Sequence, residues 1–395
     1  MSARVISLNQ DLKRLRDEGY ELEIKDGHAI IHNVPYLDVD KTVRYGVLIS
    51  PLEMSGDVVK YVNAGTAHVI YFQGTHPYCS NGEAMTGIVL TRYNEGKMFA
   101  GMQVNFSFSN KPQGGYHDYY EKFTRYISIL QAEAQAFAPD ATAQTFKRIA
   151  EDESSVFVYA DTNASRATIT DITDKLRNQK IGIVGLGGTG SYVLDQVAKT
   201  PVSEIHLYDG DIFCQHNAFR APGAPCKALL EESRKKADYF AEVYGHMHKG
   251  VVSHPVFVTD ANAHELTAFD FVFLCMDTGE YKRVIISALM KHNIAFIDTG
   301  IDISECNRQL LCTARITAAC LGETVTDLDA QIVEENISFA PVADADLYRS
   351  NIQTAELNAF CALMAVIKWK KYCGFYQDLC PYKNRVYNTN DGEFK

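Results

Sequence analysis

Four glycines within six residues form a turn of the kind that binds phosphate groups. They follow an apolar run, 181–184, which has the length and composition of a buried strand. Gly185, Gly187 and Gly190 have the spacing G-x-G-x-x-G, and Gly188 lies between them. Such a turn lets the backbone approach a phosphate closely, and the following helix offers free N–H groups and the positive end of its dipole. The stretch therefore predicts a nucleotide-binding β-α-β unit.

Polar residues after the next strand narrow the class of nucleotide. The strand 204–208 leads to Asp209, 19 residues past the last glycine, where a carboxylate suits a ribose hydroxyl. Asp211, Asn217 and Arg220 follow in the adjoining turn. A hydride-transfer site does not need this cation, whereas the planar fork of an arginine pairs well with the oxygens of a triphosphate. The pattern favours ATP.

Five short motifs follow one another in this half of the chain. They are GLGGTG (185–190), YDGD (208–211), NAFR (217–220), RKKADYF (234–240) and FDFVFLCMDTGEYKR (269–283). Together they resemble the ThiF/MoeB/E1-like adenylyltransferases, which activate the C-terminal carboxylate of ubiquitin-like or sulfur-carrier proteins. The resemblance covers roughly residues 166–372. The region ahead of it loosely resembles uncharacterised domains that precede ThiF modules in bacterial ubiquitin-like conjugation systems.

The resemblance implies a role for each matched position. The residues implied to contact ATP are Gly185, Gly187, Gly188, Gly190, Asp209, Asp211, Asn217, Arg220 and Lys236. Asp209 is implied to hold the ribose. Asn217, Arg220 and Lys236 are implied to contact the phosphates. Asp277 is implied to bind a Mg²⁺ ion that bridges the phosphates, although an aspartate there also fits the N-cap of the following helix.

The position of the catalytic lysine has to be chosen among three residues. A turn-rich insert, 221–233, separates Arg220 from the next matched motif, so Lys227 competes with Lys235 and Lys236. Lys236 fits the family pattern best because an alanine and a helix follow it. A cation there would neutralise charge as pyrophosphate leaves, and a solvated helix start is the alternative interpretation.

Two further positions depend on the resemblance alone. In homodimeric members an arginine near the first helix of the domain reaches the ATP of the partner subunit, and Arg166 fits this position as well as it fits a surface site beside a helix cap. The stretch 317–350 has little periodicity and corresponds to a crossover loop, in which Cys320 is the only cysteine. Cys320 is a candidate for the thioester nucleophile, although a packing role in the core explains this cysteine equally well. Cys306 is the alternative candidate for the nucleophile. The resemblance thus implies a homodimer and, for a thioester step, an E2-like partner.

Composition and charge limit the other function classes. The chain has 395 residues, of which 46% are hydrophobic and 22% charged, as in a globular protein of two or three domains. Its formal net charge of −11 argues against general nucleic-acid binding. No apolar run approaches the length of about 18 residues that suggests a membrane span. None of the ten cysteines forms a C-x-x-C pair, so we expect reduced thiols, a cytoplasmic location and no structural zinc of the kind many family members bind.

The chain is expected to consist of two domains. Residues 1–150 combine alternating and helical patterns with an Asp-Gly hairpin turn at 26–27, which predicts an α+β domain of unknown role. Residues 151–165 are predicted to be a linker. Residues 166–395 are predicted to form an α/β adenylation domain with a Rossmann-like, doubly wound and mostly parallel sheet. Its polar tail, 381–395, is expected to be loosely ordered.

The predicted function is ATP- and Mg²⁺-dependent adenylation of the C-terminal carboxylate of a ubiquitin-like or sulfur-carrier protein, followed in some members by thioester formation. Two alternatives belong to other classes. An NAD(P)-dependent oxidoreductase would use the same glycine turn, and a non-catalytic scaffold would keep the fold and bind the tail of a carrier protein. The presence of Arg220, Lys236 and Asp277 argues against the scaffold.

Overall fold

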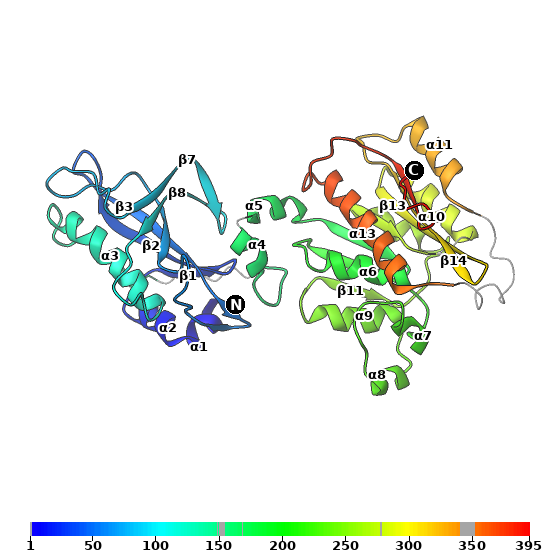
Figure 1. The fold of residues 1–395 in the computed structure, drawn as a ribbon, viewed down its shortest axis with the longest axis horizontal. Coiled ribbons are helices and arrows are strands. Elements are labelled where there is room, and N and C mark those ends of the chain that lie inside the picture. The colour runs from blue at the N-terminus through cyan, green and yellow to red at the C-terminus, as the bar shows by residue number, and fades with distance from the viewer. Residues whose placement is uncertain (1, 148, 150–154, 168, 277–278, 340–351) are drawn as a thin grey trace. The chain divides into compact units, whose positions relative to one another are not determined.

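The computed structural model describes residues 2–147, 149, 155–167, 169–276, 279–339 and 352–395, which together are called the described part of the chain below. The chain divides into two compact units, Met1–Ile172 and Thr173–Lys395 (Figure 1). Helix α4 (Thr162–Ala167) begins inside the expected linker. The sequence-based domain boundaries therefore stay predictions, and each unit is described by itself.

The first unit is built on a six-stranded antiparallel sheet in the order β1-β2-β3-β6-β8-β7. Its strands are β1 (Leu22–Lys25), β2 (His28–Leu37), β3 (Val43–Pro51), β6 (Val69–Gln73), β7 (Val89–Phe99) and β8 (Met102–Ser109), and β4 (Met54–Ser55) pairs with β5 (Val58–Val59). Between β1 and β2, Asp26 and Gly27 both have positive φ, at 46° and 70°. A two-residue hairpin needs this conformation, so the predicted turn is confirmed.

Besides α4, the described part of the first unit contains the helices α1 (Ser2–Leu8), α2 (Gln10–Asp17) and α3 (Tyr119–Gln135). Helix α3 packs on the sheet along β2 (Figure 1). Its start is capped by Asp118, whose carboxylate accepts a hydrogen bond from the Glu121 N–H at 2.7 Å. Phe123, Ile127 and Leu130 of this helix are buried together with apolar residues of the sheet. The unit thus has a hydrophobic core of its own.

One charged residue lies inside this core. The side chain of Lys122, on α3, is buried, and its Nζ donates a hydrogen bond to Ser50 Oγ at 2.8 Å. Within the described part of the chain, no carboxylate pairs with it. Burial without a counter-ion lowers the pKa of Lys122 to about 7, because the low-dielectric core disfavours the charged form.

Replacing Lys122 with methionine is expected to stabilise the first unit at pH 7 by a few kcal/mol, at roughly 1.4 kcal/mol for each unit of pKa shift. Between pH 7 and about 10.4 the unfolded chain binds the Lys122 proton and the folded chain does not, so wild-type stability rises with pH across this window. The advantage of the variant should therefore shrink toward pH 10. Urea unfolding of both proteins at several pH values measures this, and a constant difference would contradict it.

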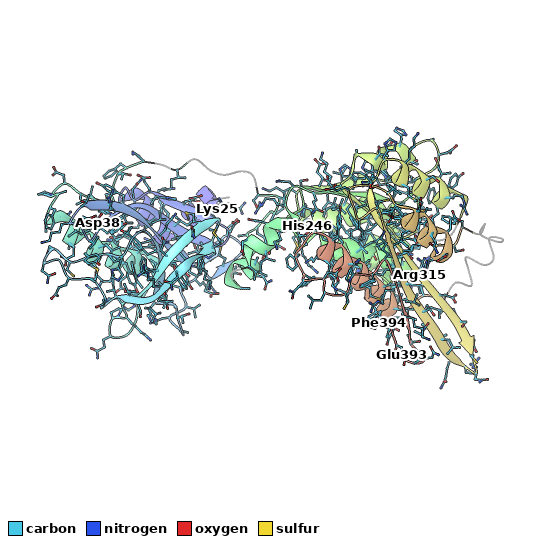
Figure 2. The ribbon with its side chains drawn as sticks, turned by 90° about the horizontal axis from the view of Figure 1, so that it is seen from above. Lys25, Asp38, His246, Arg315, Glu393 and Phe394 are labelled. Carbon is cyan, nitrogen blue, oxygen red and sulfur yellow. The ribbon has the colours of Figure 1, made fainter. Side chains whose placement is uncertain are left out.

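The second unit is built on a seven-stranded sheet in the order β11-β10-β9-β12-β13-β14-β15. Its strands are β9 (Lys180–Val184), β10 (Glu204–Tyr208), β11 (Val251–His254), β12 (Phe271–Leu274), β13 (Ala295–Cys306), β14 (Gln309–Ala319) and β15 (Asn384–Asn388). The strands from β11 to β13 run parallel, and β14 and β15 add an antiparallel edge. The ribbon of β13 and β14 extends past the other strands (Figure 2).

Helices cover both faces of this sheet. One face packs against α6 (Gly188–Val197), α9 (Lys236–Gly245) and α13 (Ala355–Tyr372), and the other against α10 (Glu280–Lys291), α11 (Asp327–Asn336) and the 3₁₀ turn η2 (Ala263–Ala268). The shorter helices are η1 (Asp174–Leu176), α7 (Gln215–Ala218) and α8 (Lys227–Glu231), and α5 (Thr170–Thr173) contains the boundary between the two units. The predicted doubly wound, mostly parallel fold is confirmed.

The central strand β12 shows why helices have to pack on both faces of the sheet. Successive side chains of a strand point to opposite faces. Phe271 and Phe273 join the core on the side of α6 and α13, while Val272 and Leu274 join the core on the side of α10. All four side chains are fully buried. A strand without a polar face is stable only when both of its faces are covered.

The structure differs from expectation in two places. The stretch 317–350 contains the helix α11, whose start is stabilised by a capping box between Thr326 and Asp329. The tail 381–395 contains β15, which pairs with β14 from Asn384 to Asn388 and so is not loose. Separately, no helix in the described part of the chain is long and apolar enough to span a membrane.

Candidate functional site

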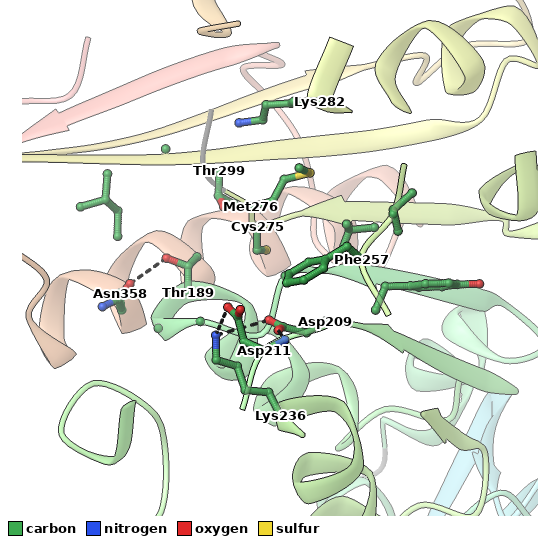
Figure 3. A pocket seen from close by; sticks show the side chains of 18 of the residues that line it. Thr189, Asp209, Asp211, Lys236, Phe257, Cys275, Met276, Lys282, Thr299 and Asn358 are labelled. Atoms are coloured by element: carbon green, nitrogen blue, oxygen red, sulfur yellow. Dashed lines mark hydrogen bonds and ion pairs between the residues drawn. The ribbon is translucent and has the colours of Figure 1, made fainter. Parts of the chain in front are cut away.

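A pocket of about 520 Å³ lies where the parallel strands of the second unit end (Figure 3). Its wall includes Val184 at the end of β9, Tyr208 at the end of β10 and Cys275 just after β12. Ligand sites of open α/β sheets form at this edge, because the loops after the strands diverge there. The pocket therefore lies where the sequence predicts a nucleotide.

The glycine turn lines this pocket, and packing explains two of its glycines. Gly185 has φ +89°, and a Cβ added to it would lie 2.7 Å from the carbonyl oxygen of Cys275. A Cβ on Gly190 would lie 1.8 Å from the carbonyl oxygen of Gly185, so only glycine fits there. Gly187 borders the pocket with nothing within 4 Å of such a Cβ. This open position leaves room for a ligand to approach the backbone at the start of α6.

Two carboxylates and one lysine form a cluster beside the turn. Asp209 accepts hydrogen bonds from the Leu186 N–H at 2.7 Å and the Asp211 N–H at 2.8 Å. Lys236 Nζ lies 2.7 Å from Asp211 Oδ2 and 3.8 Å from Asp209 Oδ2 (Figure 3). Burial raises the pKa of the Asp209 carboxyl, and the nearby Lys236 opposes that shift. A carboxylate has about four acceptor positions, so Asp209 can still accept from a ribose.

Only one of the two main competing lysines faces the pocket. Lys236 lines it, and Lys227 lies on the surface with 91% of its side chain exposed and a 3.6 Å contact to Glu231. Lys236 is only 4% exposed, so the alternative interpretation, a solvated helix start, is wrong. The reason is that α9 packs its first turn under the loop that contains Asp211, and the Lys236 N–H donates to the Asp211 carbonyl at 2.9 Å.

Arg220 and Asn217, expected to act together, occupy different places. Arg220 lines the pocket, and its buried Nε finds no hydrogen-bond acceptor in the described part of the chain. Asn217 is buried and is not part of the pocket wall. Its Oδ1 accepts a hydrogen bond from the Cys214 N–H at 2.8 Å, which closes the turn that leads to Arg220. Asn217 thus holds the turn that leads to Arg220, and its buried Nδ2 has no hydrogen-bond acceptor in the described part of the chain, so its contact with ATP stays a prediction.

Two predicted site residues lie outside this description. Asp277, the predicted magnesium ligand, is not among the described residues. The backbone of Arg166 belongs to α4, but its side chain is not described. Within the described part of the chain, no group of three or more histidines, cysteines and carboxylates could hold a metal ion. The magnesium and trans-arginine predictions therefore stay predictions.

Sequence reasoning missed one whole wall of the pocket. Lys282 and Arg315 line it, and Asp298 lies between them. A signal was present for the carboxylate, because Asp298 interrupts the apolar strand AFIDTG (295–300). The sequence also did not reveal that Asn358 of α13 reaches the pocket, where its Oδ1 accepts a hydrogen bond from Thr189 Oγ1 at 2.9 Å.

Cys320 is not arranged as a nucleophile. It is 1% exposed, it has φ +56°, and its backbone N–H donates to Asp329 Oδ1 at 3.0 Å. Burial, together with the charge of Asp329, raises the pKa of the Cys320 thiol to about 12. A reactive cysteine needs access and a lowered pKa, so the packing interpretation fits this structure better.

Alkylation tests this difference between the cysteines. At pH 8 a thiol of pKa about 12 is ionised in roughly one molecule in 10⁴, because each pH unit below the pKa reduces the thiolate tenfold. We expect iodoacetamide to modify the exposed Cys226 completely while Cys320 stays free, as read by peptide mass spectrometry. Equal rates for the two residues in the folded protein would show that the Cys320 loop opens.

Comparison with known proteins gives two matching family models and several similar solved structures. The family model described as the ThiF family matches residues 159–389, and a domain of unknown function, DUF6791, matches residues 10–162. No curated protein matches the chain.

Similar solved structures include E. coli MccB with ATP, at 17% identity and a TM-score of 0.41, covering 59% of this chain and 67% of MccB. They also include E. coli tRNA N6-threonylcarbamoyladenosine dehydratase, TcdA, at 19% identity and a TM-score of 0.38, covering 54% of this chain and 92% of TcdA. PaaA is similar at 16% identity and a TM-score of 0.45, covering 69% of this chain and 84% of PaaA.

Proposed function

Because the chain belongs to the ThiF family, we propose that it is an adenylyltransferase, which uses ATP to activate the C-terminal carboxylate of a protein or peptide. The observation that supports this most directly is the shared pocket. Arg220 and Lys236 face the same space as the open backbone at Gly187, and Asp209 lies beside them. Two cations, a helix start and a ribose-type carboxylate are the groups that an adenosine triphosphate requires.

The unpaired donor of Arg220 supports the same proposal. A buried N–H without an acceptor is costly, and native proteins rarely keep one without a reason. The Arg220 Nε is buried and has no acceptor in the described part of the chain. A phosphate oxygen would accept this hydrogen bond and, with the rest of the guanidinium, form a bidentate pair.

The reaction needs little covalent work from the protein. An oxygen of the substrate carboxylate forms a bond to the α-phosphorus of ATP, and the bond from that phosphorus to the α–β bridging oxygen breaks. Pyrophosphate leaves with the bonding electron pair, and an acyl adenylate remains. No proton moves, because the carboxylate is already ionised. The residues therefore act by positioning both substrates and by neutralising charge on the phosphates.

The pocket residues divide this work between them. Asp209 accepts from the ribose hydroxyls, with its own position fixed by the Leu186 and Asp211 N–H groups. Lys236 and Arg220 contact the phosphates, and their charge favours the transition state, in which negative charge moves toward pyrophosphate. Asp211 lies 2.7 Å from the Lys236 ammonium group and so keeps it in the wall of the pocket.

The finer parts of the proposal concern the partners. We propose a ubiquitin-like or sulfur-carrier protein as the substrate, Mg²⁺ held by Asp277, and a homodimer in which Arg166 reaches the ATP of the partner subunit. For a thioester step with an E2-like partner, Cys306 is the stronger candidate, because it is exposed at the end of β13 and Cys320 is buried.

ATP–pyrophosphate exchange tests the proposal. Radioactive pyrophosphate should enter ATP when a small β-grasp carrier protein is present, and should not enter when the last residues of that carrier are removed. In parallel, ATP should raise the melting temperature of the protein while NAD should not, because a ligand that binds only the folded state stabilises it. Stabilisation by NAD and not by ATP, without exchange, would favour the oxidoreductase instead.

A further inference from the structure

A buried ion triad forms a second charged wall of the pocket. Lys282 Nζ lies 2.6 Å from Asp298 Oδ1, and Arg315 Nη2 lies 2.7 Å from Asp298 Oδ2. Lys282 is 2% exposed and Asp298 is fully buried. Lys282 lies across the pocket from Lys236 and Asp211 (Figure 3). The pocket therefore has one group of charges at the glycine turn and another on the strands β13 and β14.

Three separate elements place this triad. Lys282 comes from the first turn of α10, Asp298 from β13, and Arg315 from β14, where it is the register partner of Gly300. A Cβ on Gly300 would lie 2.6 Å from Arg315 Nη2, so the missing side chain gives the guanidinium its place over β13. Arg315 Nη1 also donates a hydrogen bond to Thr317 Oγ1, which fixes the plane of the guanidinium.

The charges of the triad do not cancel. Two cations share one carboxylate, which leaves a formal charge of +1 among the described residues of this wall, where Lys282 and Asp298 are buried and Arg315 is 17% exposed. Burying an excess charge is unfavourable unless an anion joins it. An ammonium has three donors, and in the described part of the chain the ion pair with Asp298 is the one polar contact of the Lys282 side chain; its geometry is not that of a hydrogen bond, so Lys282 keeps donors for a further group. The triad is therefore arranged to accept one more anionic group from the pocket.

The phosphates of ATP already have cations elsewhere, at Arg220 and Lys236 beside the glycine turn. The other anion in the reaction is the carboxylate that attacks the α-phosphorus. We propose that Lys282 and Arg315, held apart by Asp298, bind the C-terminal carboxylate of the acyl substrate before it attacks ATP. This inference rests on the proposed function. According to this inference, Lys282 and Arg315 recognise the terminal carboxylate of the acyl substrate and not the side chains of its C-terminal segment.

The inference predicts discrimination between an acid and its amide. The probe is acetyl-Gly-Gly, chosen because glycine has no side chain that could clash, and the control ligand is acetyl-Gly-Gly amide. Binding is measured by ligand-observed NMR on protein saturated with α,β-methylene ATP, in which the α–β bridge cannot break. We expect the wild-type protein to bind the acid at least about tenfold more tightly than the amide, as a hydrogen bond to a charged group provides.

Matched variants then assign the preference to the triad. Lys282→Met and Arg315→Gln each leave Asp298 with one cation, and each should lower affinity for the acid about tenfold without changing affinity for the amide. The control is Arg283→Gln, the neighbouring cation on α10, which pairs with Glu334 on the surface and should keep the full preference. Affinity for the ATP analogue should stay within about twofold of wild type in all three, because the triad does not serve the nucleotide phosphates.

The outcomes separate this inference from the proposed function. A wild-type protein that binds the analogue and shows no preference for the acid overturns the inference alone, and this needs no variant. Loss of analogue affinity in Lys282→Met or Arg315→Gln would assign the triad to the phosphates and also overturn it. An unchanged preference in folded variants would reduce the triad to a structural link between α10, β13 and β14. A wild-type protein that does not bind the analogue at all would overturn the proposed function together with the inference.

Discussion

Replacing Lys236 with methionine is expected to lower the rate of ATP–pyrophosphate exchange by about 10²–10³, equivalent to about 2.7–4 kcal/mol in the barrier. The change keeps the aliphatic volume of the buried side chain and removes only its charge. Lys236 is the cation that Asp211 holds at 2.7 Å in the pocket, so its loss leaves charge on the phosphates uncompensated as pyrophosphate leaves. The rate is measured with radioactive pyrophosphate at saturating carrier protein.

Lys227→Met is the matched control for this variant. Lys227 is the lysine that sequence alone left in competition, and 91% of its side chain is exposed on α8. Its exchange rate should stay near wild type, and its melting temperature should hardly change, because exposed substitutions alter stability by about 0.5 kcal/mol or less. If Lys227→Met were inactive and Lys236→Met active, the position of the catalytic lysine would be wrong.

The melting temperature of Lys236→Met has to be measured together with its exchange rate. Removing one partner of a buried ion pair is costly, because the other charge stays behind. Here Asp211 is partly exposed and can regain water, while Asp209 keeps its two backbone donors. A solvated helix start, the alternative interpretation of the sequence, would make the removal of Lys236 almost neutral for stability. The buried Asp209 nevertheless loses the cation 3.8 Å away, so we expect a modestly lower melting temperature along with the lost exchange.

The half of the site that the sequence predicted comes from one continuous stretch. The glycine turn, Asp209 and Asp211 lie within 27 residues, 185–211, and their spacing alone fixes a β-α-β unit. Apolar runs such as 271–274 predict buried parallel strands, because they have no polar face to turn to solvent. Local patterns of this kind determine which elements form, and the order of parallel strands follows from them with few alternatives.

The other half of the site depends on contacts between elements that were not predicted from the sequence. Lys282, Asp298 and Arg315 come from three elements, and they meet only because β14 pairs antiparallel with β13 in a register that sets Arg315 opposite Gly300. A shift of one residue would turn the Arg315 side chain to the other face of the sheet. The two-residue turn Asn307–Arg308, where both φ angles are positive, sets that register, and this turn was not identified from the sequence.

The direction of side chains was a second property that could not be predicted from the sequence. Asn217 matched a motif position, but its side chain turns back to cap α7 and does not line the pocket. Cys320 lies in the expected segment, but Asp329 holds its backbone and the thiol is buried. A motif gives the position of a residue along the chain, while its role depends on the partners that the fold brings to it.

Replacing Gly190 with alanine is expected to prevent ATP binding and to destabilise the second unit. The added Cβ would lie 1.8 Å from the carbonyl oxygen of Gly185 and 3.1 Å from the Cβ of Cys275. The nearest of these atoms belongs to backbone, which cannot rotate away as a side chain can, so α6 and the glycine turn have to separate. Forcing extra atoms into a packed site costs about 1–3 kcal/mol and occasionally more. For a unit of this size the melting temperature should fall by several degrees.

Gly245→Ala provides the matched control, since it makes the same chemical change at another helical position. Gly245 is the last residue of α9, and nothing lies within 4 Å of a Cβ added to it. Alanine is favoured over glycine in a helix by about 0.5–1 kcal/mol, so this variant should be as stable as wild type or slightly more stable. Its stabilisation by ATP should be unchanged. Gly190→Ala would contradict this prediction if it were also stable and still stabilised by ATP. The glycine turn and α6 would then have to be packed less tightly than the 1.8 Å between the added Cβ and the Gly185 carbonyl oxygen indicates. The assignment of the glycine turn as the phosphate site would lose its structural basis.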